Sequence, residues 1–266
     1  MDTQRVEPVE ADEASAALVD AHIELDRELG ALDRGRSSET QRVGHRSPPL
    51  GLLASVFFAL FVASIVAHFA LTEGAPYPTP FRPLDELQAH YLRFADSARW
   101  VAMLQFGASV PFGLCAVVMV SRMLFHRVRV AGVYIALLGG LGASFFMGVS
   151  ALAGWMLSQP GVADDLGALR IAQLFMFATG GVGHTTMLGL LLAGISVPAL
   201  MFGLLPRWVC WLGLVVAAIA ELSVLSLGFP QLSILLPLAR FPAYLWLLAA
   251  AFMLPKYAVS GARMAG

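Results

Sequence analysis

The chain has 266 residues, of which 58% are hydrophobic and 13% charged, and its mean hydropathy is +0.73. Soluble domains carry about 25% charged residues, so this composition excludes an ordinary water-soluble domain. The formal net charge is −1, which gives no basic footprint for a nucleic-acid partner. We therefore expect an all-α, polytopic membrane helix bundle whose main solvent is the lipid bilayer.

Residues 1–49 form a separate region in charge and in periodicity. Ten of the eighteen acidic residues lie in residues 1–33, where a leucine-rich stripe recurs at helical spacing and predicts a short amphipathic helix. The stripe consists of Leu18, Ala21, Leu25, Leu29 and Leu32. Residues 35–49 are rich in Arg, Ser, Gly and Pro, which is typical of a flexible basic linker near anionic headgroups.

Two interpretations of this N-terminal region remain open. A helix this short is marginal in water, so the region is a solvated tail when alone. Alternatively, residues 10–33 fold on a cytoplasmic or membrane protein partner, because an apolar stripe beside an acidic face suits docking into a groove.

Six apolar segments follow, each long enough to cross about 30 Å of hydrocarbon, which takes about 20 helical residues. The predicted spans cover residues 51–72, 98–121, 130–157, 171–203, 208–228 and 232–254. The third and fourth exceed one crossing and must tilt, kink or protrude, and the glycines from Gly180 to Gly183 mark a kink. The predicted domains are residues 1–49, a six-helix domain at 50–256 and a tail at 257–266.

The basic residues predict the orientation, because short loops rich in Lys and Arg stay in the cytoplasm. One set of loops and ends carries Arg34, Arg36, Arg42, Arg46, Arg122, Arg127, Arg129, Arg207, Lys256 and Arg263. The opposite loops carry six acidic residues against four basic ones. Both termini should therefore be cytoplasmic. Arg outnumbers Lys sixteen to one and Asn is absent, a codon bias that indicates a bacterial inner membrane.

The loop from Glu73 to Arg99 is the only sizeable predicted connector. Its four prolines keep residues 76–83 extended, whereas Leu84 to Arg99 has helical spacing and predicts a helix lying flat on the outer surface. This helix either caps the bundle or lines an entrance. His68 and His90 lie on the same side, but two histidines without a fixed spacing are weak grounds for a metal site, and we expect no metal.

Small residues recur at every fourth position in the third and fourth spans. The third span carries Gly132, Ala136, Gly140, Ser144 and Gly148, and the fourth carries Gly181, Thr185, Gly189 and Ala193. Helices in lipid associate through such faces, so we predict that the third and fourth spans pack together. The competing interpretation is that one stripe serves a homodimer.

Ionisable residues within the spans are costly and therefore informative. Glu221 in the fifth span and Arg240 in the sixth fall at matching depth on consecutive antiparallel helices, which predicts an ion pair between them. Such a pair either fixes which helices face each other or serves the passage of a ligand or ion.

His184 follows the glycine cluster of the fourth span, where a loosened backbone and polar side chains could meet a cavity. It is either a buried, hydrogen-bonded structural histidine or a proton-handling group, since histidine titrates near neutral pH. Gln105 in the second span and Gln173 in the fourth are further candidates for the wall of a pocket.

A short motif carries a resemblance to a known family. The turn from Phe202 to Trp208, FGLLPRW, and the following Trp211-Leu212-Gly213-Leu214 resemble a bacterial family of six-span membrane proteins known only as a domain of unknown function. The resemblance covers about residues 50–256. It implies the six-helix fold, and it implies neither an activity nor catalytic residues.

Two functional hypotheses follow from these patterns. The first is a non-enzymatic subunit or regulatory partner, which the N-terminal helix and the small-residue faces favour. The second is a small permease or proton-coupled transporter whose polar site is formed by Glu221, Arg240 and His184. An enzyme is less favoured, because no cluster of carboxylates, histidines or nucleophiles has usable spacing. We expect no cofactor, haem included.

Overall fold

The computed structural model describes residues 24–25, 27–28 and 42–259. These residues are mostly helical, and six helical segments are long and apolar enough to cross a membrane. The segments cover Leu50–Leu71, Ala95–Phe125, Ala131–Leu157, Leu166–Phe202, Arg207–Leu227 and Pro230–Met253. The predicted helical bundle with six candidate spans is therefore confirmed, with helix ends shifted by a few residues.

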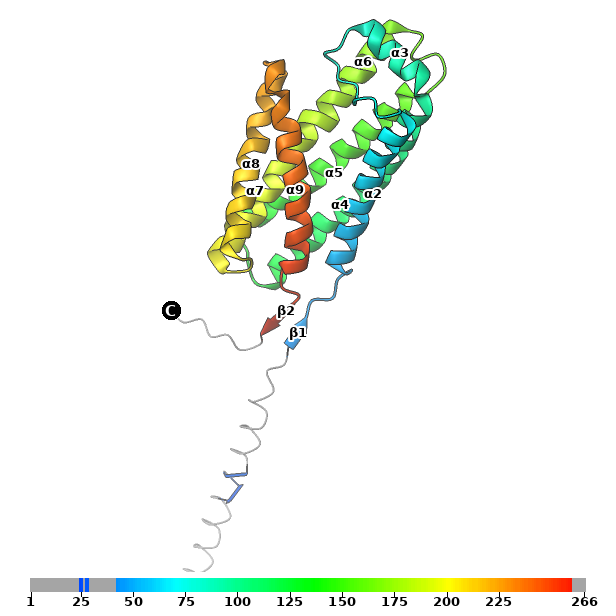
Figure 1. Cartoon of the computed structure of the whole chain (residues 1–266). Helices are drawn as coiled ribbons and strands as arrows, with labels where there is room; N and C mark the ends of the chain where they lie inside the picture. The colour runs from blue at the N-terminus through cyan, green and yellow to red at the C-terminus, as the bar shows by residue number, and fades with distance from the viewer. Residues whose placement is uncertain (1–23, 26, 29–41, 260–266) are drawn as a thin grey trace, which may run out of the picture. The chain divides into compact units, whose positions relative to one another are not determined.

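The spans pack in chain order, and the last returns to the first (Figure 1). The main helices are α2 (Leu50–Leu71), α4 (Ala95–Phe125), α5 (Ala131–Leu157), α7 (His184–Phe202), α8 (Arg207–Leu222) and α9 (Leu235–Met253). In the fourth span, α6 (Leu166–Met176) continues through the π-helix η1 (Phe177–Gly183) into α7. Two 3-10 helices, η2 (Ser223–Leu227) and η3 (Pro230–Ile234), join α8 to α9. The contact between α9 and α2 closes the bundle.

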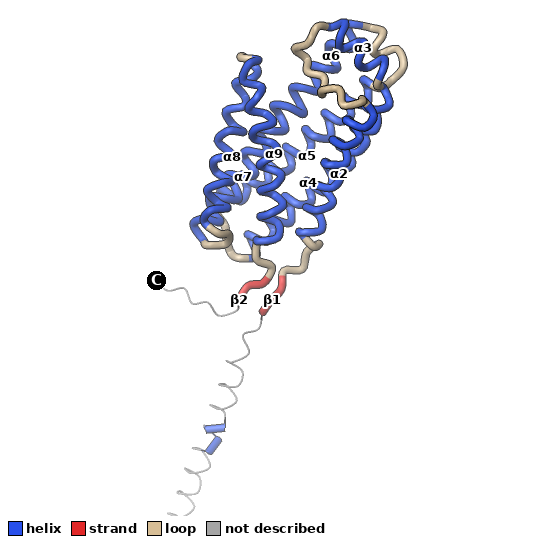
Figure 2. Tube along the Cα trace, in the orientation of Figure 1, coloured by secondary structure: helices blue, strands red, loops and turns tan. Residues whose placement is uncertain are grey.

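The predicted helix of the long loop is α3 (Leu84–Arg93), which lies beside α6 at one end of the bundle (Figure 2). Leu87 and Tyr91 are buried in a small apolar cluster with residues from the ends of α5 and α6. The helix ends at Arg93, earlier than predicted, because the residues from Ala95 onward already belong to α4. Its contacts with α4 and α6 are those of a cap on the bundle.

The turn that carries the family resemblance has a local physical cause. Gly203 ends α7 in the left-handed conformation, with φ 66°, and its N–H donates to Ala199 O. Glycine adopts this conformation without a steric penalty and is the common residue after a helix end. Pro206 is the N-cap residue of α8, where its missing N–H costs no hydrogen bond, and Arg207 begins the helix.

The third span packs against the fourth, but its small residues face two different neighbours. A Cβ on Gly132 would lie 2.8 Å from Pro198 Cγ of α7, as expected for the predicted contact. Gly140 lies against Ala116 of α4 as well as Leu191 of α7, and Ser144 Oγ donates to Ser109 O of α4 at 2.7 Å.

Helix geometry explains why the third-span stripe faces two helices and not the fourth span alone. Residues four apart advance by about 40° around a helix of 3.6 residues per turn, so the stripe from Gly132 to Gly148 rotates through almost half a turn. The fourth-span stripe also faces other helices than predicted. Gly189 lies against Ala220 of α8, and Gly181 lies against Leu236 of α9.

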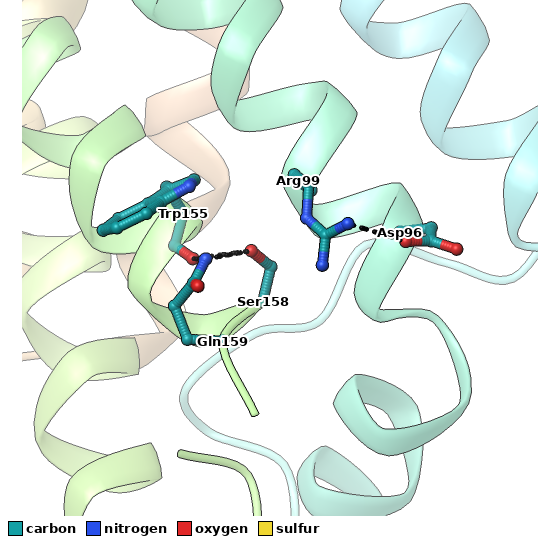
Figure 3. Close-up of polar contacts among 5 residues, drawn as sticks. All are labelled: Asp96, Arg99, Trp155, Ser158 and Gln159. Carbon is teal, nitrogen blue, oxygen red and sulfur yellow. Dashed lines mark hydrogen bonds and ion pairs between the residues drawn. The ribbon is translucent and has the colours of Figure 1, made fainter. Parts of the chain in front are cut away.

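The ends of α4 and α5 carry local polar contacts beside the α3 end of the bundle (Figure 3). Trp155 O accepts hydrogen bonds from Ser158 Oγ at 2.6 Å and from Gln159 Nε2 at 3.1 Å, which satisfies a carbonyl in the last turn of α5. Near the start of α4, Arg99 and Asp96 form an exposed ion pair of 3.3 Å. Such surface pairs contribute about 0 to 1 kcal/mol, so this group terminates helices and is not a candidate site.

The segments that precede and follow the bundle in the sequence pair with each other. Strand β1 (Arg42–Gly44) and strand β2 (Tyr257–Val259) are antiparallel, with Val43 opposite Ala258. The sequence patterns did not predict these strands. Of the predicted N-terminal helix, residues 24–25 and 27–28 are helical, and the rest of residues 10–33 lies outside the described residues.

Two glycines of α5 should respond differently to alanine. In Gly140→Ala, the new Cβ would overlap Ala116 Cβ and force α4 and α5 apart, and such overpacking costs about 1 to 3 kcal/mol. In the control Gly148→Ala, the Cβ would lie 3.4 Å from Ser109 Oγ, an ordinary contact. A fluorogenic maleimide that reports exposure of the buried Cys115 and Cys210 thiols measures thermal unfolding in detergent. We expect a lower melting temperature for Gly140→Ala alone, and equal melting temperatures would contradict the assigned contact.

Candidate functional site

A cavity of about 630 Å³ lies inside the half of the bundle nearest α3. Sites that bury drug-sized ligands have volumes of about 300 to 1,000 Å³. Its wall is built by α2, α4, α5, α6, η1, η3, α7 and α9, together with the loop at residues 77–81. Four of the five predicted pathway residues line it, namely Gln105, Gln173, His184 and Arg240. Glu221 does not.

Arg240 projects from α9 toward the π-helical segment of the fourth span. Its Nη2 donates to Gly180 O and makes longer contacts with Gly181 O at 3.4 Å and Thr185 Oγ1 at 3.5 Å. Its Nε is buried without a hydrogen-bond partner. Backbone carbonyls therefore hold the guanidinium through one nitrogen, and a donor remains unused.

The glycine cluster explains how the backbone reaches the arginine. Residues 177–183 form a π-helix. This arrangement is rare among helices in general, but the π-helices that do occur are often found at functional sites. A Cβ on Gly180 would collide with Ser150 Oγ of α5, so only glycine fits at this approach. The loosened backbone predicted at these glycines is present as this π-helix.

His184 is 1% exposed and has partners at both ring nitrogens. Nδ1 lies 2.8 Å from Ala143 O, and Nε2 lies 2.6 Å from Tyr244 Oη. A carbonyl can only accept, so Nδ1 carries a proton, and Nε2 of the neutral ring accepts from the tyrosine hydroxyl. Of the two interpretations of His184, this geometry fits the buried, hydrogen-bonded structural histidine better than the proton-handling group.

Gln173 ties the loop and α3 to the fourth span. Tyr91 Oη donates to Gln173 Oε1 at 2.7 Å, and Gln173 Nε2 donates to Pro78 O at 3.1 Å. Arg170 Nη1 donates to Pro80 O at 2.7 Å, one turn earlier in α6. The segment around residues 77–81 is therefore held over the end of the cavity by hydrogen bonds from α6.

The predicted ion pair between Glu221 and Arg240 is wrong. The ion pairs among the described residues join Arg82 to Glu86, Arg93 to Glu73 and Arg99 to Asp96. Glu221 Oε1 is buried without a hydrogen-bond partner and fills the space beside Gly189 of α7, 2.7 Å from where a Cβ there would lie. Residue counts predict a matching depth, but the two side chains meet different turns of the fourth span, Glu221 beside Gly189 and Arg240 at Gly180 O.

Tyr244 is the main cavity residue that the sequence reasoning missed. It is 1% exposed, bonds to His184 and packs on Phe57 and Phe61 with ring centroids 4.9 and 4.6 Å apart. Residues four apart share a helix face, so Arg240 could have indicated Tyr244 as its neighbour on α9.

The two histidines near α3 do meet, with ring centroids 6.2 Å apart. Burial, with smaller contributions from the charges of His68 and Arg82, lowers the pKa of His90 below its usual 6.5. Among residues 24–25, 27–28 and 42–259, no three His, Cys, Asp or Glu side chains gather in a group that could hold a metal ion.

Comparison with protein-family models, with curated proteins and with solved structures found no match. The resemblance to a six-span family of unknown function therefore stays a prediction.

The bond between Tyr244 and His184 is testable through stability. In Tyr244→Phe, His184 Nε2 loses its partner inside the bundle, and leaving a buried polar group unsatisfied costs about 1 to 3 kcal/mol. Tyr134→Phe is the matched control, because Tyr134 on α5 is 58% exposed. Thermal unfolding in detergent should show a lower midpoint for Tyr244→Phe alone, and an unchanged midpoint would mean that the hydrogen bond does not form.

Proposed function

We propose that the protein is a small permease that binds an organic molecule in this cavity and passes it across the membrane. The observation that carries the proposal is the convergence of Arg240, His184, Gln105 and Gln173 on one cavity inside the bundle. Ionisable residues within membrane spans are expensive, and where they line a cavity they mark substrate pathways.

The backbone around the cavity supports transport over simple packing. Many transporters bind substrate near the middle of the membrane, where interrupted helices present backbone groups. Here the fourth span is interrupted by η1, and the carbonyls of Gly180 and Gly181 turn toward Arg240. The rings of Phe57 and Phe112, which do not line the cavity, pack on Tyr244 of its wall. A site closed on one side by packed side chains is what one state of an alternating-access cycle requires.

For the location we propose a bacterial inner membrane with both termini in the cytoplasm. The Arg-rich loops support this orientation through the positive-inside rule. It places the α3 end, and with it the cavity, in the outer half of the bilayer.

The regulatory-subunit hypothesis depends on residues 10–33, most of which lie outside the described residues. It stays a second proposal, which a search for a bound protein partner tests separately. A stoichiometric protein partner that is lost on deletion of residues 1–33 would support it.

The permease proposal predicts that the cavity holds a bound ligand and that one larger side chain in the cavity wall prevents its binding. A Cβ on Gly181 meets its nearest atom, Leu236 Cδ1, at 3.4 Å, so Gly181→Leu adds a side chain at the cavity wall without a backbone collision. Gly107→Leu is the control, because Gly107 lies outside the cavity and a Cβ there meets only Leu60 Cδ1 at 3.9 Å.

Native mass spectrometry of protein extracted from its own membrane in mild detergent is the measurement. We expect one bound small molecule in the wild type and in Gly107→Leu, and at least a tenfold lower occupancy in Gly181→Leu. A bound molecule that survives in Gly181→Leu would place its site elsewhere, and a wild-type protein without any would remove the basis of the proposal.

A further inference from the structure

We infer that the cavity takes a single-chain amphiphile with a carboxylate head, which enters sideways from the bilayer between α2 and α9. The inference rests on the proposed ligand-binding function and names the chemical class of the ligand. Its head group would meet Arg240, and its chain would lie along the apolar wall.

The charge of the cavity selects an anion. Arg240 is the only Lys, Arg, Asp or Glu side chain among the described residues that line it. Among the described residues, no carboxylate forms an ion pair with this guanidinium, and Glu221 faces α7 instead. An unpaired cation is costly inside a membrane, and a ligand anion removes that cost by pairing with it.

The unused donor of Arg240 favours a carboxylate over a neutral head. All three contacts of the guanidinium with the protein start from Nη2, and Nε has none. Nε is enclosed by the bundle, so a carboxylate would meet the guanidinium at its Nη1 and Nη2 end, where two parallel N–H donors match its planar geometry. A hydroxyl or an ammonium head would leave the positive charge uncompensated.

The wall of the cavity favours an apolar chain that arrives from lipid. Phe69 of α2, Ile234 of η3 and Phe241 of α9 line the cavity and are also 49%, 65% and 47% exposed. The cavity therefore reaches the surface of the bundle between the first and last spans. There the surface consists of large apolar side chains, which is the side that faces hydrocarbon in a membrane-spanning bundle.

The alternative route, from water at the α3 end, is covered. The loop at residues 77–81 lies over that end, and Arg170 and Gln173 hold it through hydrogen bonds to Pro80 O and Pro78 O. Phe81 of the loop also packs on Phe177 of η1, with ring centroids 5.1 Å apart. Between α2 and α9, by contrast, ring contacts such as Phe61 with Phe241 at 6.0 Å form the seam.

The test compares four probes on the full-length protein in lipid nanodiscs, by scintillation proximity with radiolabelled probes. Dodecanoate, dodecanol and dodecyltrimethylammonium share one chain and differ in the head, and butyrate carries the carboxylate without the long chain. Empty nanodiscs correct for partition into lipid. We expect dodecanoate to bind about ten- to a hundredfold more tightly than dodecanol and dodecyltrimethylammonium, the range that hydrogen bonds to a charged group supply. It should also bind more tightly than butyrate, which lacks the apolar chain.

Three variants assign the preference to Arg240. Arg240→Gln should bring dodecanoate to the affinity of dodecanol, and Arg240→Lys should keep part of the preference because it keeps the charge. Arg207→Gln removes an exposed charge at the start of α8, outside the cavity, and should change nothing. The thiol-based unfolding assay shows whether each variant is folded.

The outcomes separate this inference from the proposed function. Equal binding of dodecanoate and dodecanol, or a preference that survives in Arg240→Gln, would overturn the carboxylate head. Butyrate binding as tightly as dodecanoate would overturn the apolar chain and, with it, the argument for entry from the lipid side. Binding of none of the four probes, while mass spectrometry finds another molecule that Gly181→Leu removes, would overturn the ligand class and leave the permease proposal standing.

Discussion

The contact between Arg240 and the carbonyls of η1 is the constraint on which the rest of the site depends. A guanidinium inside the hydrocarbon needs partners, and backbone oxygens supply them most readily where a helix departs from its regular hydrogen-bond ladder. The π-helix at residues 177–183 provides that departure, and it requires glycine because Ser150 of α5 leaves no room for a Cβ at Gly180. The arginine, the glycines and the serine come from three different spans. The residue type at each of these three places therefore depends on the residue types at the other two.

The same contact links the cavity to the closure of the bundle. Arg240 fixes α9 against the fourth span, and Tyr244, one turn later on α9, reaches both His184 and the aromatic rings of α2. The last span is thereby joined to the fourth through polar groups and to the first through rings. Among the described residues, ring contacts rather than hydrogen bonds join α2 to α9 in the half of the bundle that contains the cavity.

Residue patterns predicted the spans well because hydrophobic length is a local property, and bilayer thickness sets it directly. They also placed Gln105, Gln173, His184 and Arg240 at candidate sites, since polar residues stand out against apolar spans. They failed where rotation about a helix axis decides the outcome. Glu221 and Arg240 meet different turns of the fourth span, at Gly189 and at Gly180, and the stripe beginning at Gly132 passes from α7 to α4. A rotation of this kind depends on all the packed neighbours at once, so no single span encodes it.

A permease built on this bundle must open the half of the interior that the aromatic cluster fills. The cluster joins Phe57 and Phe61 of α2 to Tyr244 of α9, and its rings interact without hydrogen bonds to each other. The packing of α5 on α4 and α7 is different, because glycines there bring backbones within reach of each other and leave no slack for sliding. Separation along the α2 and α9 seam therefore disturbs fewer close backbone contacts than separation of α5 from α4 or α7. For a permease, the seam beside the cavity is thus a better place to open than the contacts of α5.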